Sequence, residues 1–499
     1  MSDPHFLGLD VGTSAVKAIL VAPDGELRAQ ASVPLTLAVP EPGWAEQDPN
    51  AWWSAAIAVL HQLRDTAADA DVAALGISGQ MHSSVLLDRA GQVVRPALLW
   101  CDGRTTAECA ALTRSLGGEA ALRDLVRNAA LEGFTLPKLL WVRNHEPEAW
   151  RRVATVLLPK DFIRFRLTGV LATEPSDASG TLLFDPARRV WSDAVLRAAE
   201  LPAALLPAVG ESAEVLGRLT PEAGAVTGLP PGTPVVGGGA DNACGALGVG
   251  VVSSGEAVAS WGTSGTVLAP VAEPLVDPLL RAHTFCHVVP GHWYLMGVVL
   301  SAGAAFAWYR DQLARELAGV SGADPALTRE AEPVPPGARG ITFLPYLAGE
   351  RTPHRDAGAR GALLGLSLSH SRAELTRAVL EGIGFALRDC LEVLRELGVA
   401  PAQLVLTGGG ARNPFLRRLQ AEIFGVPVCT VNHEEGPAFG AALLAAVGAG
   451  AFPDLQTAAR ATLRRSAPDA PSREAHLAYA EPYARFRAAY PALRAARVE

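Results

Sequence analysis

Three short turns in the sequence are rich in glycine and hydroxyl residues, and each follows an apolar, strand-like run. They are Gly12-Thr13-Ser14, Gly262-Thr263-Ser264 and Gly408-Gly409-Gly410. Because glycine has no Cβ, such turns let backbone N–H groups approach phosphate oxygens, and the hydroxyls add further donors. A single turn of this kind is weak evidence, since most glycine turns serve only to reverse the chain. Together the three turns predict a nucleotide site built from several segments.

Two aspartates stand in surroundings that favour chemistry. Asp10 ends the first apolar run, directly before the first turn, and Asp241 follows three glycines and an alanine at a predicted helix start. A buried carboxylate is costly unless it is paired, hydrogen-bonded or close to a metal. Asp241 has two interpretations. It is either a cap of that helix, or a general base that the substrate reaches through a cleft lined by the glycines. Two lone aspartates without a histidine cluster favour Mg²⁺-dependent phosphoryl transfer over zinc chemistry.

The remaining reactive side chains give weaker signals. His283 and His287 are four residues apart but have no third ligand and no acidic base nearby, so we expect them in the core or a cleft wall. Ser83 is not part of a Gly-x-Ser-x-Gly elbow. The sequence has no P-loop motif and no Gly-x-Gly-x-x-Gly after its first strand, which excludes a P-loop enzyme and argues against a dinucleotide-binding fold.

The elements that must position these residues alternate between strands and helices. Apolar runs at 6–10 and 16–21 bracket the first turn as a hairpin, and the second turn, 250 positions later, is flanked in the same way. A hairpin repeated half a chain apart is the signature of a duplicated domain. A long amphipathic helix is predicted at 373–397, a strand at 404–406 and a small-residue helix at 436–448. We therefore expect an α/β protein.

Composition limits the class of protein. The 499 residues fit two domains of about 250 residues each. With 49% hydrophobic and 19% charged residues, the chain is not disordered or fibrous, and its net charge of −8 argues against nucleic acid or an anionic membrane as a partner. The six cysteines form no Cys-x-x-Cys pair, which predicts reduced core thiols. Without a recognisable signal peptide or membrane-spanning run, a cytoplasmic location is expected.

These motifs belong to a longer series of matching stretches between residues 8 and 446. The stretches include GLDVGTSAVKAIL, ISGQMH, LLWCDGRT, LPKDFIRFRLTG, SDASGTLLFD, GGGADNACGALGVG, SWGTSG, LPYLAGERTPH, LTGGGARNPFLRRLQAEIFGVPV and EEGPAFGAALLA. In this series the sequence resembles the FGGY family of carbohydrate kinases. The resemblance implies two ribonuclease-H-like α/β domains, as in actin, hexokinase and the heat-shock chaperone ATPase, with the active site in the cleft between them. It places a sugar-side domain at 4–248, a nucleotide-side domain at 257–446 and an outer helical extension at 447–499.

The resemblance also implies a role for each site residue. Asp241 would be the catalytic base that takes the proton of the sugar hydroxyl, and Asp10 would be catalytic through Mg²⁺ and the phosphates. The sugar pocket would be lined by Met81, His82, Asp241 and Asn242. ATP would be bound by Gly12, Thr13, Ser14, Gly262, Thr263, Ser264, Gly409, Gly410 and Asn413. The implied cofactors are ATP and Mg²⁺.

Within this resemblance the Met81-His82 pair favours D-xylulose as the substrate, because glycerol-phosphorylating members typically carry Arg-Glu there. L-ribulose, glycerol, gluconate or a deoxysugar are the alternatives. Cys101 and Ser83-Ser84 depart from the residues common in the family, asparagine and Gly-Ala, on the expected sugar side. A more distant alternative is a non-catalytic, actin-like or chaperone-like ATPase. The expected partners are the sugar and ATP, and a homodimer would agree with family habit.

Overall fold

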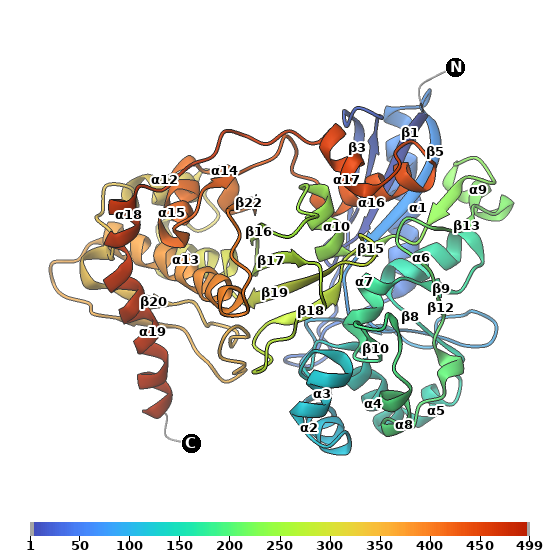
Figure 1. The fold of residues 1–499 in the computed structure, drawn as a ribbon, viewed down its shortest axis with the longest axis horizontal. Coiled ribbons are helices and arrows are strands. Elements are labelled where there is room, and N and C mark those ends of the chain that lie inside the picture. Colours follow the sequence, from blue (N-terminus) through green and yellow to red (C-terminus); the bar gives the residue numbers. More distant parts are fainter. Residues whose placement is uncertain (1–3, 497–499) are drawn as a thin grey trace.

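The computed structural model describes residues 4–496, and these form two α/β lobes, each built around a mixed sheet (Figure 1). The strands of the first sheet lie in the order β13-β14-β5-β1-β2-β3, with β15 paired to β5, and those of the second in the order β18-β19-β17-β16-β22-β23. The first sheet comprises β1 (Pro4–Val11), β2 (Ala15–Val21), β3 (Leu27–Pro34), β5 (Asp71–Gly79), β13 (Val215–Arg218), β14 (Pro234–Val236) and β15 (Gly239–Ala240). The second comprises β16 (Glu256–Trp261), β17 (Gly265–Val271), β18 (His283–Cys286), β19 (Trp293–Val299), β22 (Gln403–Gly408) and β23 (Val428–Cys429).

Helices surround both sheets, and short strand pairs lie outside them. The helices are α1 (Pro49–Thr66), α2 (Thr106–Ser115), α3 (Glu119–Val126), α4 (Thr135–His145), α5 (Pro147–Trp150), α6 (Pro159–Thr168), α7 (Pro175–Ala178), α8 (Asp193–Ala198), α9 (Pro221–Thr227), α10 (Asp241–Gly248), α11 (Gly303–Gln312), α12 (Ala323–Ala331), α13 (Arg372–Glu396), α14 (Gly409–Arg412), α15 (Pro414–Phe424), α16 (Gly436–Gly448), α17 (Leu455–Thr462), α18 (Arg473–Ala478) and α19 (Ala480–Ala495). The short strands are β4 (Glu46–Gln47), β6 (Val85–Leu87), β7 (Ala97–Leu98), β8 (Thr155–Leu157), β9 (Ala172–Thr173), β10 (Phe184–Asp185), β11 (Val190–Trp191), β12 (Ala208–Val209), β20 (Thr342–Leu344) and β21 (Ala362–Leu364).

The two sheets have the same topology at their centres. In the first sheet β1 pairs antiparallel with β2, β2 pairs antiparallel with β3, and β5 lies parallel to β1. In the second, β16 pairs antiparallel with β17, β17 pairs antiparallel with β19, and β22 lies parallel to β16. Each Gly-Thr-Ser turn closes the first hairpin of its sheet. The predicted duplication of an α/β domain is therefore confirmed.

The small-residue helix α16 packs on the first sheet, although it follows the second sheet in the sequence (Figure 1). This approach requires glycine on the strands beneath it. A Cβ at Gly8 would lie 1.9 Å from the carbonyl oxygen of Ala438, and one at Gly76 would lie 2.0 Å from that of Ala441. Together α10 and α16 cover one face of the first sheet, while α1 and α6 pack from the other side.

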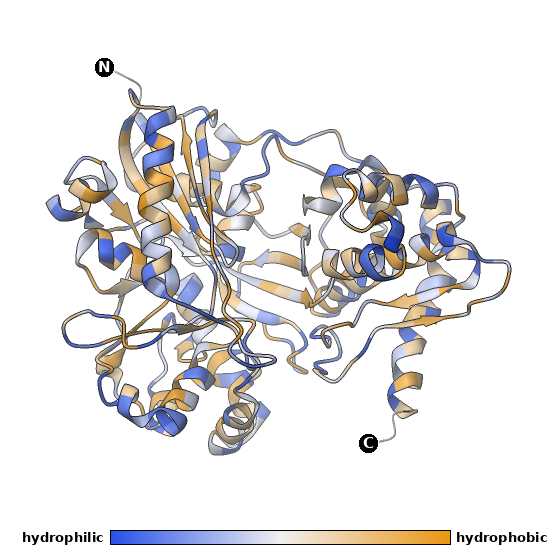
Figure 2. Cartoon of the chain, turned by 180° about the vertical axis from the view of Figure 1, so that it is seen from behind, coloured by the Kyte–Doolittle hydropathy of each residue, from blue (hydrophilic) through white to orange (hydrophobic). Residues whose placement is uncertain are grey.

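The second sheet has its own core under α13, and the C-terminal segment contributes to it. The side chains of Tyr479, Tyr483 and Phe486 are buried there, and Arg377 donates a hydrogen bond to the Tyr479 hydroxyl at 2.6 Å. The segment predicted as an outer extension at 447–499 thus contributes to both cores, because Leu455, Ala458 and Ala459 on α17 are buried in the first, and its last three residues are outside the described range. Apolar colouring gathers on the strands and the inward helix faces (Figure 2). No helix within 4–496 is long and apolar enough to cross a membrane.

Candidate active site

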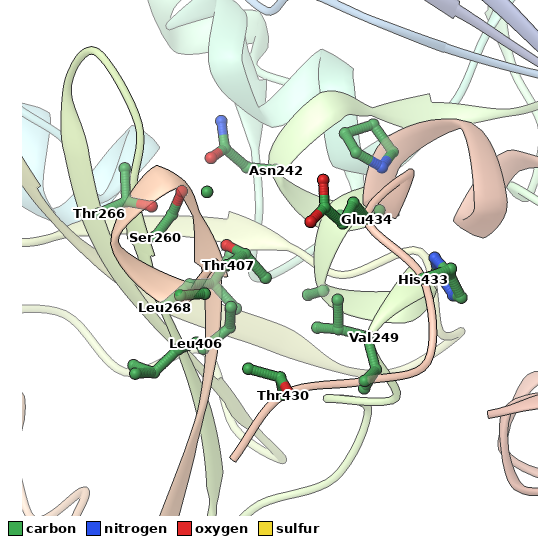
Figure 3. A pocket seen from close by; sticks show the side chains of 18 of the residues that line it. Asn242, Val249, Ser260, Thr266, Leu268, Leu406, Thr407, Thr430, His433 and Glu434 are labelled. Atoms are coloured by element: carbon green, nitrogen blue, oxygen red, sulfur yellow. The ribbon is translucent and has the colours of Figure 1, made fainter. Parts of the chain in front are cut away.

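A cavity of 580 Å³ lies between the two lobes, a volume within the usual range for small-molecule sites (Figure 3). One wall is the start of α10 with α16, and the opposite wall is the second sheet with the loop at 430–434. Its polar lining comes from several elements: Asp241 and Asn242 on α10, Ser260 on β16, Thr266 on β17, Thr407 on β22, Arg412 on α14, Arg417 on α15, and Thr430, His433 and Glu434 on the loop. The cavity is therefore bounded by residues from both halves of the duplicated chain.

Asp241 is the first residue of α10, and Ala240 occupies the N-cap position. Its carboxylate accepts hydrogen bonds from the backbone N–H (2.7 Å) and side-chain Nδ2 (2.9 Å) of the adjacent Asn242. The alternative interpretation, that Asp241 caps the helix, is wrong, because a cap would sit one residue earlier and bond the second or third amide. Burial, reinforced by the negative charge of Asp10, raises the pKa of Asp241 to about 7. Such a carboxylate can accept a proton near neutral pH.

Asp10 lies at the end of β1, opposite Ser78 on β5 and Lys17 on β2. Its Oδ1 atom is buried and has no hydrogen-bond partner among residues 4–496. Burial raises the pKa of Asp10 to about 6, although the Ser78 hydroxyl and the charge of Lys17 oppose this shift. A carboxylate oxygen without a partner, next to a glycine turn of the kind that binds phosphate, is a suitable ligand for a hard cation such as Mg²⁺. Among residues 4–496, no group of three or more His, Cys, Asp or Glu side chains converges to hold a metal ion.

The first Gly-Thr-Ser turn is held by buried polar side chains. Thr13 Oγ1 donates to Gln80 Oε1 at 3.0 Å and accepts from Trp100 Nε1 at 2.9 Å. The carbonyl oxygen of Thr13 accepts from Gln47 Nε2 at 2.8 Å. With the hydroxyl and the carbonyl of Thr13 both engaged, the turn between β1 and β2 is held in one conformation.

The second Gly-Thr-Ser turn is held instead by the backbone at the start of α11. The carbonyl oxygen of Gly262 accepts from Gly303 N at 2.7 Å, and that of Thr263 accepts from Ala302 N at 3.1 Å. A Cβ at Gly303 would lie only 2.6 Å from Gly262 O, so glycine is needed for this approach. The side chain of Thr263 is exposed to solvent.

The third turn divides into residues that line the cavity and residues that lie behind it. Gly408, with φ of +77°, and Gly409 line the cavity. Gly410 packs under the Trp261 side chain, where a Cβ would approach to 2.8 Å. Asn413 caps α15 by accepting from the Phe415 amide at 2.9 Å. The structure therefore brings Gly408 and Gly409 to the cavity, whereas Gly410 and Asn413 shape the elements behind them.

Met81 and His82 follow β5 and lie close to the Asp241-Asn242 pair. Asn242 Nδ2 is 3.6 Å from Met81 Sδ. His82, with φ of +68°, donates from Nδ1 to the carbonyl oxygen of Gly180 at 2.5 Å. Burial lowers the pKa of His82 well below its ordinary value, so the ring is neutral. The four residues expected on the sugar side are thus brought together by β5 and α10.

A buried ionic cluster behind Asp241 was missed by the sequence reasoning. Lys160 Nζ lies 2.7 Å from Asp161 Oδ1, 3.4 Å from Glu174 Oε1 and 3.6 Å from Asp177 Oδ2, and all four side chains are inaccessible to solvent. One signal in the sequence could have found it. The chain has only three lysines among 43 basic residues, and one of them is Lys160, directly before Asp161 at the start of the helix region at 159–168.

The weaker candidates follow the expectations in part. His283 and His287 are buried, and His283 Nδ1 lies 3.0 Å from Asn128 Oδ1, so the prediction that both are core or wall residues is confirmed. All six cysteines are free. Five are buried as predicted, but Cys101 is exposed, and the core prediction is wrong for it because it lies in the loop after β7.

Two duplicated lobes with glycine turns, and two half-buried aspartates at the end of β1 and the start of α10, form the arrangement of a phosphotransferase of the actin-like ATPase fold. Residues 5–248 match the N-terminal domain of the FGGY family of carbohydrate kinases, and residues 257–449 match its C-terminal domain. The chain belongs to this family. It is a carbohydrate kinase, and its substrates are a sugar and ATP.

Individual relatives are similar over nearly the whole chain. The chain is 42% identical to the xylulose kinase of Escherichia coli (strain K12) over 96% of both sequences. It superposes on the xyloylose kinase of Brucella ovis with a TM-score of 0.91 at 38% identity, covering 99% of this chain and 100% of the other. It also superposes on the gluconate kinase of Lactobacillus acidophilus with a TM-score of 0.92 at 27% identity, covering 98% of both chains.

Proposed function

We propose that the protein transfers the γ-phosphoryl group of ATP to D-xylulose, giving D-xylulose 5-phosphate in xylose catabolism. The observation that carries this proposal is the carboxylate of Asp241, which stands at the cleft beside Asn242 and forms no ion pair with any of residues 4–496. The xylulose kinases to which the chain is similar support D-xylulose as the sugar.

Asp241 is the general base in this proposal. A sugar hydroxyl is a poor nucleophile near neutral pH, and its proton leaves as the phosphoryl group arrives. The two hydrogen bonds from Asn242 orient the carboxylate while leaving its second oxygen for the sugar hydroxyl. Because phosphoryl transfer has a loose transition state, the enzyme acts mainly by positioning and charge stabilisation.

Asp10 is the proposed protein ligand of Mg²⁺, and its unpartnered Oδ1 fits that role. When bound, Mg²⁺ neutralises charge on the phosphates, and in such sites it is usually held by one or two carboxylates together with the phosphates. The proposed phosphate-binding groups are the backbone N–H groups of two turns, 12–14 and 262–264, with the hydroxyls of Ser14, Thr263 and Ser264, because the Thr13 hydroxyl already donates to Gln80. Gly409 contacts the nucleotide in this proposal, while Gly410 and Asn413 support the adenosine side through α14 and α15.

The sugar side of the proposed site is formed by Met81, His82 and Asn242. Neutral His82, which donates from Nδ1 to Gly180, keeps Nε2 as an acceptor for a sugar hydroxyl. The resemblance in structure to a gluconate kinase supports D-gluconate as the second candidate substrate. A homodimer is the proposed assembly, and light scattering on the purified protein tests it.

The test of this proposal is sugar-dependent release of ADP, measured in a coupled assay. D-xylulose, L-ribulose, glycerol, D-gluconate and 1-deoxy-D-xylulose are compared as acceptors. We expect the highest kcat/KM for D-xylulose. A higher kcat/KM for D-gluconate would move the assignment to the second candidate, and the absence of stimulation by every sugar would contradict the kinase proposal itself.

A further inference from the structure

The ionic cluster behind Asp241 is joined to the backbone of the proposed base by one serine. Ser176 Oγ donates to Glu174 Oε1 at 2.8 Å and accepts from the backbone N–H of Ala240 at 3.0 Å. Ala240 is the residue directly before Asp241. Since a serine hydroxyl has one proton and that proton points to Glu174, its lone pairs face the Ala240 amide. The hydroxyl is therefore held in one direction by the carboxylate.

The opposite end of the cluster holds the same glycine segment at a second point. Arg164 lies 2.9 Å from Asp161 and donates from Nη1 to the carbonyl oxygen of Gly237 at 2.7 Å. The two anchors, at Gly237 and Ala240, bracket two glycines, which have no side chains of their own to fix them. The charged cluster thus acts as a buried support for the segment that leads into α10.

The charges within the cluster balance if one acid is neutral. Burial raises the pKa of Asp177 well above its ordinary value, which favours its neutral form. Burial opposes the charge of Lys160, but the surrounding carboxylates outweigh it and raise the pKa of Lys160. The other two acids are held by cations, since Lys160 contacts Asp161 and Glu174, and Arg164 contacts Asp161. Such a buried cluster is a rigid support, because removing any partner leaves a buried charge unpaired.

Asp241 itself depends on this backbone support. Among residues 4–496, its hydrogen bonds come only from Asn242, its own neighbour on the chain, so they orient the carboxylate without fixing the segment in the protein. We propose that Ser176, held by Glu174 and Lys160, is a positioning residue that sets the place of Asp241 through the Ala240 amide. This inference rests on the proposed role of Asp241 as the general base.

The chain offers a matched control for Ser176. Ser212 is also a buried serine, and its Oγ donates to the other oxygen of Glu174 at 2.8 Å. The contact of Ser212 with the glycine segment runs through its backbone oxygen, which accepts from Gly238 N at 2.9 Å and survives substitution by alanine. The variants S176A and S212A therefore remove the same kind of hydrogen bond to Glu174, but only S176A also removes the link to Ala240.

The experiment compares kcat, the KM values for sugar and ATP, and the thermal midpoint of both variants and the wild-type enzyme. We expect S176A to lower kcat by about tenfold to 100-fold with KM within about twofold, because a shift of about 1 Å in a reacting group costs up to about 100-fold. S212A removes one hydrogen bond instead of two, so it should lose less stability and keep a kcat within about twofold of the wild type. If S176A does not fold, S176C replaces it, since a thiol is a weaker acceptor.

Each outcome decides the inference. Wild-type kcat in folded S176A, or an equal loss of kcat in both variants, overturns it, because the effect would then not pass through Ala240. D241N, measured in the same assay, separates the two proposals. If D241N loses activity while S176A does not, the base assignment stands and the positioning role fails. If D241N keeps the wild-type kcat, the base assignment fails, and the positioning role fails with it.

Discussion

The two Gly-Thr-Ser hairpins occupy equivalent places in the two sheets but differ in the side chain that precedes the turn and in the contacts that hold it. The strand before the first turn ends in Asp10-Val11, and the strand before the second ends in Ser260-Trp261. The position that carries a carboxylate in the first copy therefore carries a hydroxyl in the second. Because a carboxylate can hold a cation and a serine is neutral, the duplicated fold is symmetric in its backbone but not in its charge.

The two hairpins also differ in what holds them. Buried side chains fix Thr13 in the first turn, whereas backbone amides at the start of α11 fix the second turn and leave Thr263 exposed. Backbone support tolerates many substitutions, while side-chain support depends on particular residues. The first hairpin therefore joins a carboxylate to a turn held by side chains, whereas the second joins a neutral hydroxyl to a turn held by the backbone.

The largest expected effect lies outside both hairpins, at Asp241. We expect Asp241→Ala to lower kcat by at least about 100-fold, the lower end of general-base contributions. Sugar-dependent ADP release by the folded variant measures this loss, with circular dichroism as the check on folding. A near-wild-type kcat would exclude Asp241 as the base and make Asp10, in the first hairpin, the next residue to test.

The second prediction compares the effect on kcat of matched substitutions in the two hairpins. We expect Asp10→Asn to lower kcat by at least about tenfold and to weaken activation by Mg²⁺, because it removes the charge of the proposed metal ligand. The matched change in the other copy, Ser260→Ala, should leave kcat within about threefold. Titration of both variants with Mg²⁺ at saturating ATP measures the difference. Equal losses in the two variants would contradict the asymmetry.

A smaller effect concerns what holds each turn. Thr13→Val leaves Trp100 Nε1 without its acceptor, so we expect it to lower the free energy of unfolding by about 1–2 kcal/mol. Thr263→Val changes an exposed side chain and should stay within about 0.5 kcal/mol of the wild type. Urea unfolding followed by fluorescence compares the two. Comparable destabilisation would show that the side chains support both turns alike.

The smallest expected effect is a pH-dependent gain in stability. The pKa of Asp241 is raised from 3.8 to about 7 in the folded protein, so its contribution to stability is present below pH 4 and is lost as the pH rises through 7. Asp241→Asn should therefore be more stable than the wild type at pH 8, with a smaller difference at pH 5. Unfolding in EDTA at both pH values measures it. Ser260→Ala, which has no titrating group, should show no such dependence on pH.

The sequence by itself determined the local elements and the main chemical groups. The predicted helices at 373–397 and 436–448 are observed as α13 and α16, and the strand at 404–406 lies within β22. These succeed because amphipathic periodicity and glycine turns act over a few residues. Asp10 and Asp241 stood out for the same reason, since each is a lone carboxylate among apolar or glycine neighbours.

Only the tertiary structure decided what supports those groups. The burial of Lys160, and the bond from Ser176 to the amide before Asp241, join segments far apart in the sequence, so no local pattern shows them. Likewise α16 returns to the first sheet because Gly8 and Gly76 leave room for its backbone there, a fit that periodicity alone does not show. Local chemistry selects which residues can react, and long-range packing decides where they are held.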